Sequence, residues 1–483
     1  MSEIAFGSAV ELAAAIQRRE IGCVELLQHF LGRVDRHNER LNAIIVQRRD
    51  EALAEAGEAD AALARGDDVG PLHGVPMTVK ESYDVTGTPT TWGVPRLKDN
   101  IAERDALSIE RLRRAGAIIF GKTNVPLLLS DFQSYNEIYG TTNNPWDTKR
   151  APGGSSGGSA ATLAAGLTGL ETGSDIGGSI RNPAHFCGVF GHKPTWNLLP
   201  PRGHAMPGVL TPSDISVIGP LARSAADLET AVRIMAGPDE IAARGLKLEL
   251  PSLAKAPSDL KVAVWRDDEA APVDASVSAR VDLVADALAS LGAELDYDAR
   301  PVEPGHSHET YQRLLQATMA ARIPEEQYLR AVARADALAP DDNSLAAISA
   351  RAQVARFRDW SAANEARTHL RWQWHRFFAE YDILLTPIMA TSAIEHDHRP
   401  MGERTVTVNG QPQDYFRQVF WSGLTGVAYL PSTIVPTGPD DSGLPIGVQI
   451  AGPEYGDLIT IGVAQLLERE GFAFRAPPGF DGA

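Results

Sequence analysis

The sequence has 483 residues, of which 43% are hydrophobic and 22% charged, a composition typical of a folded globular protein. Its formal net charge of −17 argues against nucleic acid or an anionic membrane as the main partner, because both are bound through clustered lysine and arginine. Two cysteines, Cys23 and Cys187, give no disulfide framework and no zinc-site spacing, which fits a cytoplasmic location. The first twenty residues do not resemble a signal peptide, and no run of about 18 apolar residues predicts a membrane span.

The first half of the chain divides into two segments that differ in composition and hydrophobic pattern. Residues 8–66 are rich in Ala, Glu and Arg with helical periodicity, so we predict packing helices over residues 1–66, the first capped by Ser8. From Pro71 to about Ala236, short apolar runs alternate with Gly, Pro, Ser and Thr and with helical stretches. This alternation predicts an α/β sheet.

The second half predicts a continuation of that sheet with a helical interruption. Residues 259–298 have the pattern of one strand–helix–strand unit, and residues 309–380 are helical. The apolar runs YDILLTPIMA and LPIGVQIAG then indicate further strands.

Two Gly/Ser-rich segments follow one another closely: APGGSSGGSAATLAAG at 151–166 and ETGSDIGGSIRNPA at 171–184. Glycine lets backbone N–H groups approach a ligand, and Gly177 and Gly178 directly precede Ser179. Such N–H groups could stabilise an oxyanion that develops during attack by a serine. The alternative is a pair of tight turns.

Lys80 ends the apolar run GVPMTVK. A buried ammonium is costly, so a lysine in such a strand has a lowered pKa and can act as a base. The alternative is a strand-end lysine whose long side chain reaches solvent.

Together these pieces resemble one family. The segments PLHGVPMTVKESYDVTGTPTT, GKTNVP, NNPWDTKRAPGGSSGGSAA, SDIGGSIRNPA and FCGVFGHKPT are similar to the amidase-signature hydrolases in order and spacing. RLRRAGAIIFGKTN, DILLTP and GLPIGVQIAG extend the match to most of the chain. The resemblance implies one α/β/α sandwich domain over residues 1–483, built on a large mixed β-sheet. Its catalytic core would span 67–236, and a variable helical insertion at 300–380 would shape the substrate entrance.

The resemblance also implies a catalytic triad. Lys80 would be the base, Ser155 a bridging serine that follows a cis peptide bond, and Ser179 the nucleophile. An amide would then be hydrolysed through an acyl-enzyme, with no metal and no cofactor, and an ester as a side substrate. For Lys80 to act near pH 8, its pKa must be about two units below its usual value of about 10.4.

Further residues match family positions around the nucleophile. The oxyanion hole would be formed by backbone N–H groups of the DIGGS loop, and three side chains would brace that loop. The predicted donors are Ile176, Gly177, Gly178 and Ser179, and the predicted supports are Asp175, Arg181 and Ser156.

The predicted substrate pocket rests on weaker matches. The run Leu127-Leu-Leu-Ser-Asp131 differs from the A-type component of the tRNA-dependent amidotransferase and is closer to fatty acid amide hydrolase, in which this segment lines the acyl pocket. We therefore expect an apolar or aromatic small-molecule amide, contacted by Leu129, Asp131, Gln133 and Trp196, with the helices between Trp360 and Trp374 nearby. Whether the leucine run faces substrate or core stays open, as does a homodimer. An amidotransferase component that releases ammonia from glutamine for a partner is the first alternative.

Three further patterns in the sequence favour other functions less strongly. Gly116 to Thr123 satisfies the phosphate-loop pattern, but its middle residues are the core of a strand. Gly154 to Gly158 satisfies the nucleophile-elbow pattern, which makes an α/β-hydrolase with Ser156 as nucleophile the second alternative, although no strand precedes it. The histidines of His306-Ser-His308 and Glu395-His-Asp-His398 lie in polar, loop-like stretches, where we expect solvated side chains rather than metal ligands.

Overall fold

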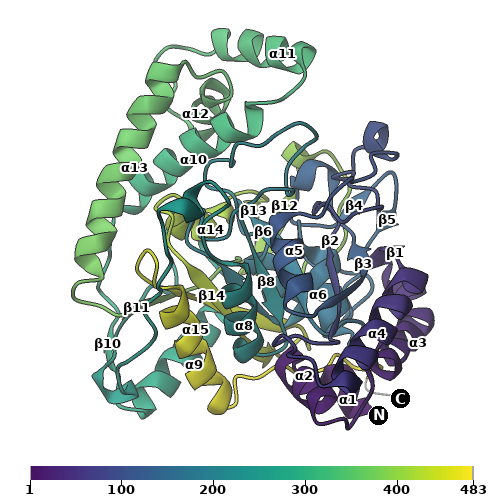
Figure 1. The fold of residues 1–483 in the computed structure, drawn as a ribbon. Helices are drawn as coiled ribbons and strands as arrows, with labels where there is room; N and C mark the ends of the chain where they lie inside the picture. Colours follow the sequence, from purple (N-terminus) through teal and green to yellow (C-terminus); the bar gives the residue numbers. More distant parts are fainter. Residues whose placement is uncertain (1, 481–483) are drawn as a thin grey trace.

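The computed structural model describes residues 2–480 and contains an eight-stranded mixed sheet (Figure 1). Strands from the C-terminal half form one end of the sheet in parallel pairs, and the remaining pairs are antiparallel. The order across the sheet is β10 (Glu294–Asp296), β9 (Lys261–Val264), β11 (Ile383–Thr386), β15 (Pro445–Ala451), β14 (Ser432–Pro439), β7 (Phe190–Lys193), β8 (Val217–Ala222) and β6 (Glu171–Asp175).

Both faces of this sheet are buried. In β9, Val262 and Val264 belong to one hydrophobic core, and Ala263 between them belongs to a second core. Because successive side chains of a strand point to opposite faces, the two cores lie on opposite sides of the sheet. Helices α8 (Ala225–Met235), α9 (Ala275–Ser290) and α15 (Asp457–Arg469) contribute to the first core, and α7 (Arg181–Cys187) and α14 (Val419–Gly426) to the second. The predicted sandwich of helices around a mixed sheet is confirmed.

A smaller sheet continues the large one beyond β6. Its order is β1 (Ile44–Gln47), β3 (Ile118–Thr123) and β2 (Pro76–Lys80), with β2 and β3 parallel. The Gly169 N–H, just before β6, donates to the Pro76 carbonyl over 3.0 Å, so β2 lies beside the edge of the large sheet. The prediction of helices alone over residues 1–66 is wrong at β1, which pairs antiparallel with β3.

The N-terminal helices pack beneath this smaller sheet (Figure 1). They are α1 (Ser2–Phe6), α2 (Ala9–Gln17), α3 (Cys23–Leu41) and α4 (Arg49–Arg65). Ser8 caps α2 as predicted, since its Oγ accepts from the Glu11 N–H while the Glu11 carboxylate accepts from the Ser8 N–H. The remaining short elements are α5 (Leu107–Arg114), α6 (Gly157–Ala164), β4 (Tyr135–Asn136), β5 (Gly140–Thr141), β12 (Thr405–Val408) and β13 (Gln411–Asp414).

Four consecutive helices rise from one side of the sandwich (Figure 1). They are α10 (Pro304–Ala320), α11 (Glu325–Asp336), α12 (Leu345–Ala352) and α13 (Phe357–Phe377). The predicted helical stretch over 309–380 is confirmed, as is the parallel strand–helix–strand unit formed by β9, α9 and β10. Between residues 2 and 480 no helix is long and apolar enough to cross a membrane.

Candidate active site

Lys80 is the last residue of β2, and its side chain is completely buried. Its Nζ donates to three hydroxyl groups, those of Ser155 at 2.7 Å, Ser156 at 2.9 Å and Ser174 at 2.9 Å. Burial lowers the pKa of Lys80 to about 7, although the nearby carboxylates of Asp175 and Glu171 act in the opposite direction. The amine is therefore substantially neutral near pH 7, as a base requires.

The two Gly/Ser-rich segments meet at Lys80. The peptide bond between Gly154 and Ser155 is cis, as the family resemblance implies. A side chain at Gly154 would place its Cβ 2.3 Å from the Asp131 carbonyl oxygen, so only glycine fits there. The Ser156 N–H donates to the Ser179 carbonyl over 3.1 Å, which joins the first segment to the second.

The loop after β6 is held by a buried ion pair. The Asp175 carboxylate accepts from the N–H groups of Gly178 at 2.8 Å and Ile180 at 3.0 Å, and it pairs with the Arg181 guanidinium at 2.8 Å. Both side chains are fully buried. Burial raises the pKa of Asp175, but the Arg181 charge outweighs it, so the net pKa lies well below the ordinary value.

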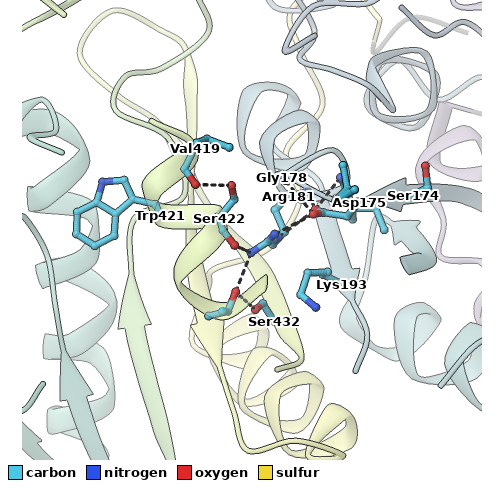
Figure 2. Close-up of polar contacts among 12 residues, drawn as sticks. Ser174, Asp175, Gly178, Arg181, Lys193, Val419, Trp421, Ser422 and Ser432 are labelled. Carbon is cyan, nitrogen blue, oxygen red and sulfur yellow. Dashed lines mark hydrogen bonds and ion pairs between the residues drawn. The ribbon is translucent and has the colours of Figure 1, made fainter. Parts of the chain in front are cut away.

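Arg181 extends this support to the C-terminal third of the chain. Figure 2 shows its guanidinium between Asp175 and Ser422 of α14. Nη1 donates to the Ser422 carbonyl at 3.2 Å, to Thr425 Oγ1 at 2.9 Å and to Gln449 Oε1 at 2.7 Å. The predicted supports Asp175 and Arg181 thus lie directly behind the loop that carries Ser179.

The predicted oxyanion donors are not equivalent. The Gly178 N–H is already donated to Asp175, so Gly178 has to be removed from the predicted set. The N–H groups of Ile176, Gly177 and Ser179 donate to no acceptor among residues 2–480 and remain available to a ligand. Gly178 has a φ of 107°, a conformation that favours glycine, and it turns the backbone between Gly177 and Ser179.

A hydroxyl from the helical region fixes one of these donors. The Tyr311 O–H of α10 donates to the Ile176 carbonyl over 2.9 Å. Because a trans peptide is planar, its C=O and N–H point in opposite directions, and holding the Ile176 carbonyl also orients the Gly177 N–H. Tyr311 lies 135 residues from Ile176 in sequence, and no motif pointed to it.

A cavity of about 920 Å³ opens onto this arrangement. Ser155, Ser174, Ile176 and Ser179 form its reactive end, whereas Ser156 is fully buried against Lys80. The residues before Ser156 form no strand, which also counts against a nucleophile elbow.

Leu129 lines the cavity as predicted, together with Leu127 and Leu128, which are 50% and 45% exposed. This answers the question of which way the leucine run faces. Its short 3₁₀ turn, Leu127–Leu129, presents the three side chains to the cavity rather than to the core.

Three other predicted pocket residues need correction, because none lies on the cavity wall. Asp131 forms a buried ion pair with Arg404 at 2.6 Å and accepts from the Tyr415 hydroxyl at 2.7 Å. Gln133 exchanges hydrogen bonds with the backbone of residue 397. Trp196 stacks on Tyr429 with ring centroids 4.8 Å apart.

The helical wall also differs from the prediction. Trp360 and Trp374 lie on α13, where Trp374 is buried in the second core, and neither lines the cavity. The wall comes instead from the C-terminal end of α10, from α11 and from residue 353.

Sequence reasoning missed two aromatic residues of the cavity, Trp92 and His204. Glu81 accepts from the N–H groups of Thr91 and Trp92 and so holds this segment in place. Burial, reinforced by the nearby Lys80, lowers the pKa of His204 to about 3, so its ring is neutral. Glu81, directly after Lys80 in the sequence, was the available signal for Trp92.

The rejected patterns have clear structural positions. Lys122 lies in β3 and donates to the Pro89 carbonyl and to Thr90, so the phosphate-loop pattern falls on a strand as expected. His306 and His308, however, lie in α10 rather than in a loop, and His308 is half-buried beside Phe420. The expectation of solvated loop histidines is wrong for His308.

The site thus combines a buried lysine, three serines at the reactive end of the cavity and backbone N–H groups without an acceptor among the described residues. The sequence matches the family model described as Amidase over residues 25–460. Indoleacetamide hydrolase of Bradyrhizobium diazoefficiens is 34% identical over 95% of this chain and 86% of that protein. The A-type component of the glutamyl-tRNA(Gln) amidotransferase of an Anaeromyxobacter species is 32% identical over 97% of both chains.

A solved structure agrees. A bacterial aryl acylamidase of the amidase signature family superposes with a TM-score of 0.82 at 26% identity, covering 98% of this chain and 99% of that one. The chain belongs to the amidase signature family. It is an amidase, a hydrolase that acts on amide C–N bonds.

Proposed function

We propose that the protein hydrolyses a small apolar or aromatic amide with Ser179 as nucleophile, Ser155 as proton relay and Lys80 as base. The observation that carries this proposal is the buried Lys80 amine 2.7 Å from Ser155 Oγ, with Ser155 and Ser179 on the wall of one cavity. The low pKa of Lys80 supports the role of base.

The reaction begins with attack on the amide carbonyl carbon. Neutral Lys80 takes the proton of Ser155 while Ser155 takes that of Ser179, whose Oγ forms the new bond. The N–H groups of Ile176, Gly177 and Ser179 stabilise the resulting oxyanion. The C–N bond then breaks, and the proton held by Lys80 returns through Ser155 to the leaving amine.

Deacylation uses the same groups. A water molecule gives its proton through Ser155 to Lys80 and attacks the acyl carbon. The C–O bond to Ser179 breaks, Ser179 recovers its proton, and the carboxylic acid leaves. Esters present the same carbonyl with a better leaving group, so we expect esterase activity as a side reaction.

The cavity supports an apolar substrate. Its wall beyond the serines carries the leucine run at 127–129, Trp92 and Met206. Burial of such side chains favours an apolar acyl or amine group. The names of the two hydrolase relatives, an aryl acylamidase and an indoleacetamide hydrolase, are consistent with an aromatic group.

A second candidate rests on the 32% identity to the amidotransferase component. In that case the protein would release ammonia from glutamine only with a partner present. Assays of glutamine and of an aryl anilide with the isolated protein separate the two candidates. Anilide hydrolysis without glutaminase activity favours the amidase, and the reverse pattern after addition of a partner favours the amidotransferase.

Covalent labelling tests the catalytic roles. A fluorophosphonate probe should modify Ser179, as located by peptide mapping, and Lys80→Met should slow the labelling at least about 100-fold. Lys122→Met is the matched control. Lys122 is equally buried in the neighbouring strand, but its amine donates to Pro89 and Thr90 and not to the serines that Lys80 contacts.

The control protein should keep its label on Ser179. Label on Ser156, or equal labelling rates in the wild type and Lys80→Met, would contradict the proposal.

A further inference from the structure

We propose that the substrate carries a carboxylate remote from the scissile amide, bound by arginines at the cavity wall; this rests on the proposed function. The charged residues that line the cavity are Arg96, Arg322, Arg330 and Arg334. No aspartate or glutamate lines the cavity in the described part of the chain. The whole sequence has 62 acidic residues and 45 lysines and arginines, so this wall has the opposite charge balance.

The local partners leave most of this charge uncompensated. Arg96 and Arg322 make no hydrogen bond or ion pair with any residue from 2 to 480. Arg334 donates to the neutral side-chain oxygen of Gln353. Arg330 pairs with Glu326 at 3.1 Å, but both side chains are largely exposed, and such pairs are weak.

The carboxylate of Asp214, close to the cavity in sequence, is occupied by other partners. Asp214 follows the cavity residue Ser213, but its carboxylate accepts from Arg367 at 2.7 Å and from the Tyr429 hydroxyl at 2.7 Å. The positive charge of the arginines therefore remains available to a ligand.

Two of the four arginines lie on the helical side of the cavity. The reactive end, formed by Ser155, Ser174, Ile176 and Ser179, has no charged side chain on its wall. Arg330 and Arg334 lie on α11, which stands at the outer edge of the molecule (Figure 1). Apolar residues such as Leu128 and Met319 make up much of the remaining wall.

This distribution selects a substrate with three parts. The amide group would lie at the serines, an apolar body along the leucine run, and an anionic end at the arginines. Arginine suits that end because its planar guanidinium binds a carboxylate through two parallel hydrogen bonds. An ammonium at the same end would be repelled.

The test uses the full chain and anilides that differ only in the end of one tail: carboxylate, hydroxyl or ammonium. One series of tail lengths is placed in the acyl group and another in the amine. In at least one series, kcat/KM should be highest for carboxylate and lowest for ammonium, with roughly tenfold between carboxylate and hydroxyl. Salt at about 1 M should remove most of the difference, because it shortens the screening length to ~3 Å.

Variants locate the effect. The double variant Arg96→Gln/Arg322→Gln should reduce the carboxylate-to-hydroxyl ratio of kcat/KM several-fold. The control Arg358→Gln/Arg376→Gln removes two exposed arginines of α13 that do not line the cavity, and it should leave the ratio unchanged. The ratio is compared within one protein, so a general loss of activity cancels.

The inference is overturned if the three tails are hydrolysed at equal rates or if the ammonium tail is preferred. In that case, hydrolysis of the hydroxyl anilide and labelling of Ser179 still support the proposed function. Labelling of Ser179 without hydrolysis of any tail also overturns it. If Ser179 is not labelled and no tail is hydrolysed, the proposed function fails and the inference fails with it.

Discussion

The two walls of the cavity are built in different ways. Behind the reactive wall, which is the one formed by Ser155, Ser174, Ile176 and Ser179, three charged side chains are fully buried and have close polar partners: Lys80, Asp175 and Arg181. On the helical wall, Arg322 and Arg330 are exposed, and the Arg330 ion pair is open to solvent. Proton transfer and oxyanion stabilisation need fixed positions away from water, whereas recognition of a distant group does not. In the proposals made above, the first wall carries out the chemistry and the second determines selectivity.

The largest effect expected from the reactive wall is the loss of the nucleophile. Ser179→Ala should lower kcat on an aryl anilide by roughly 10⁴-fold or more, because acylation can no longer start. The variant loses only one hydroxyl, so its circular dichroism spectrum should match that of the wild type. A variant that kept a tenth of the activity would place the nucleophile elsewhere.

Lys80 should set the pH dependence of that wall. Its pKa is lowered to about 7, and the base works only when neutral, so kcat/KM should fall about tenfold per pH unit below that value. A plateau is expected above pH 8. Lys80→Met should lose roughly 10³-fold in kcat/KM and the acidic limb with it. A rate that stayed flat from pH 8 to pH 5 in the wild type would contradict this role.

Loss of an ion pair should lower the free energy of unfolding much more at the reactive wall than at the helical wall. Asp175→Asn leaves the Arg181 charge buried without its carboxylate and should lower the free energy of unfolding by about 3–5 kcal/mol. Glu326→Gln breaks the exposed pair with Arg330 and should change it by no more than about 0.5 kcal/mol. Urea unfolding of both variants measures the difference, and similar losses would mean that the comparison is mistaken.

The smallest effect is expected where the walls meet. Tyr311→Phe removes the hydroxyl that holds the Ile176 carbonyl, at a cost of about 1 kcal/mol, and so should lower kcat a few-fold with little change in KM. Tyr381→Phe is the control, since its hydroxyl contacts Asp296 at the far edge of the sheet. A purely structural role for Tyr311 would instead lower stability and leave kcat unchanged.

Much of the reactive wall could be predicted because its residues lie in continuous motifs. Lys80, Ser155 and Ser179 each sit within a segment that matches the family, and all three meet at one site. The orientation of single groups could not be predicted in the same way. Asp175 was predicted to brace the loop, but the motif does not indicate which N–H groups its carboxylate accepts from, and one of them is that of Gly178.

The pocket was harder to predict because its residues depend on distant partners. Asp131 is drawn away from the cavity by Arg404, which lies 273 residues further along the chain. Strand β1 was missed because its apolar run is short and only pairing with β3 makes it a strand. Local periodicity does not indicate that Asp131 pairs with Arg404 or that β1 pairs with β3. Long helices such as α13 could be predicted from periodicity alone.

The contacts of Arg181 with residues near the C-terminus have a consequence for the newly synthesised protein. Its guanidinium links the loop that carries Ser179 to Ser422, Thr425 and Gln449, which are synthesised more than 200 residues after Ser179. The lysine and the serines are synthesised early, but their scaffold is completed only when the last strands arrive. We therefore expect a nascent chain to lack this support until residue 449 has been synthesised, so that the loop reaches its final arrangement only late in translation.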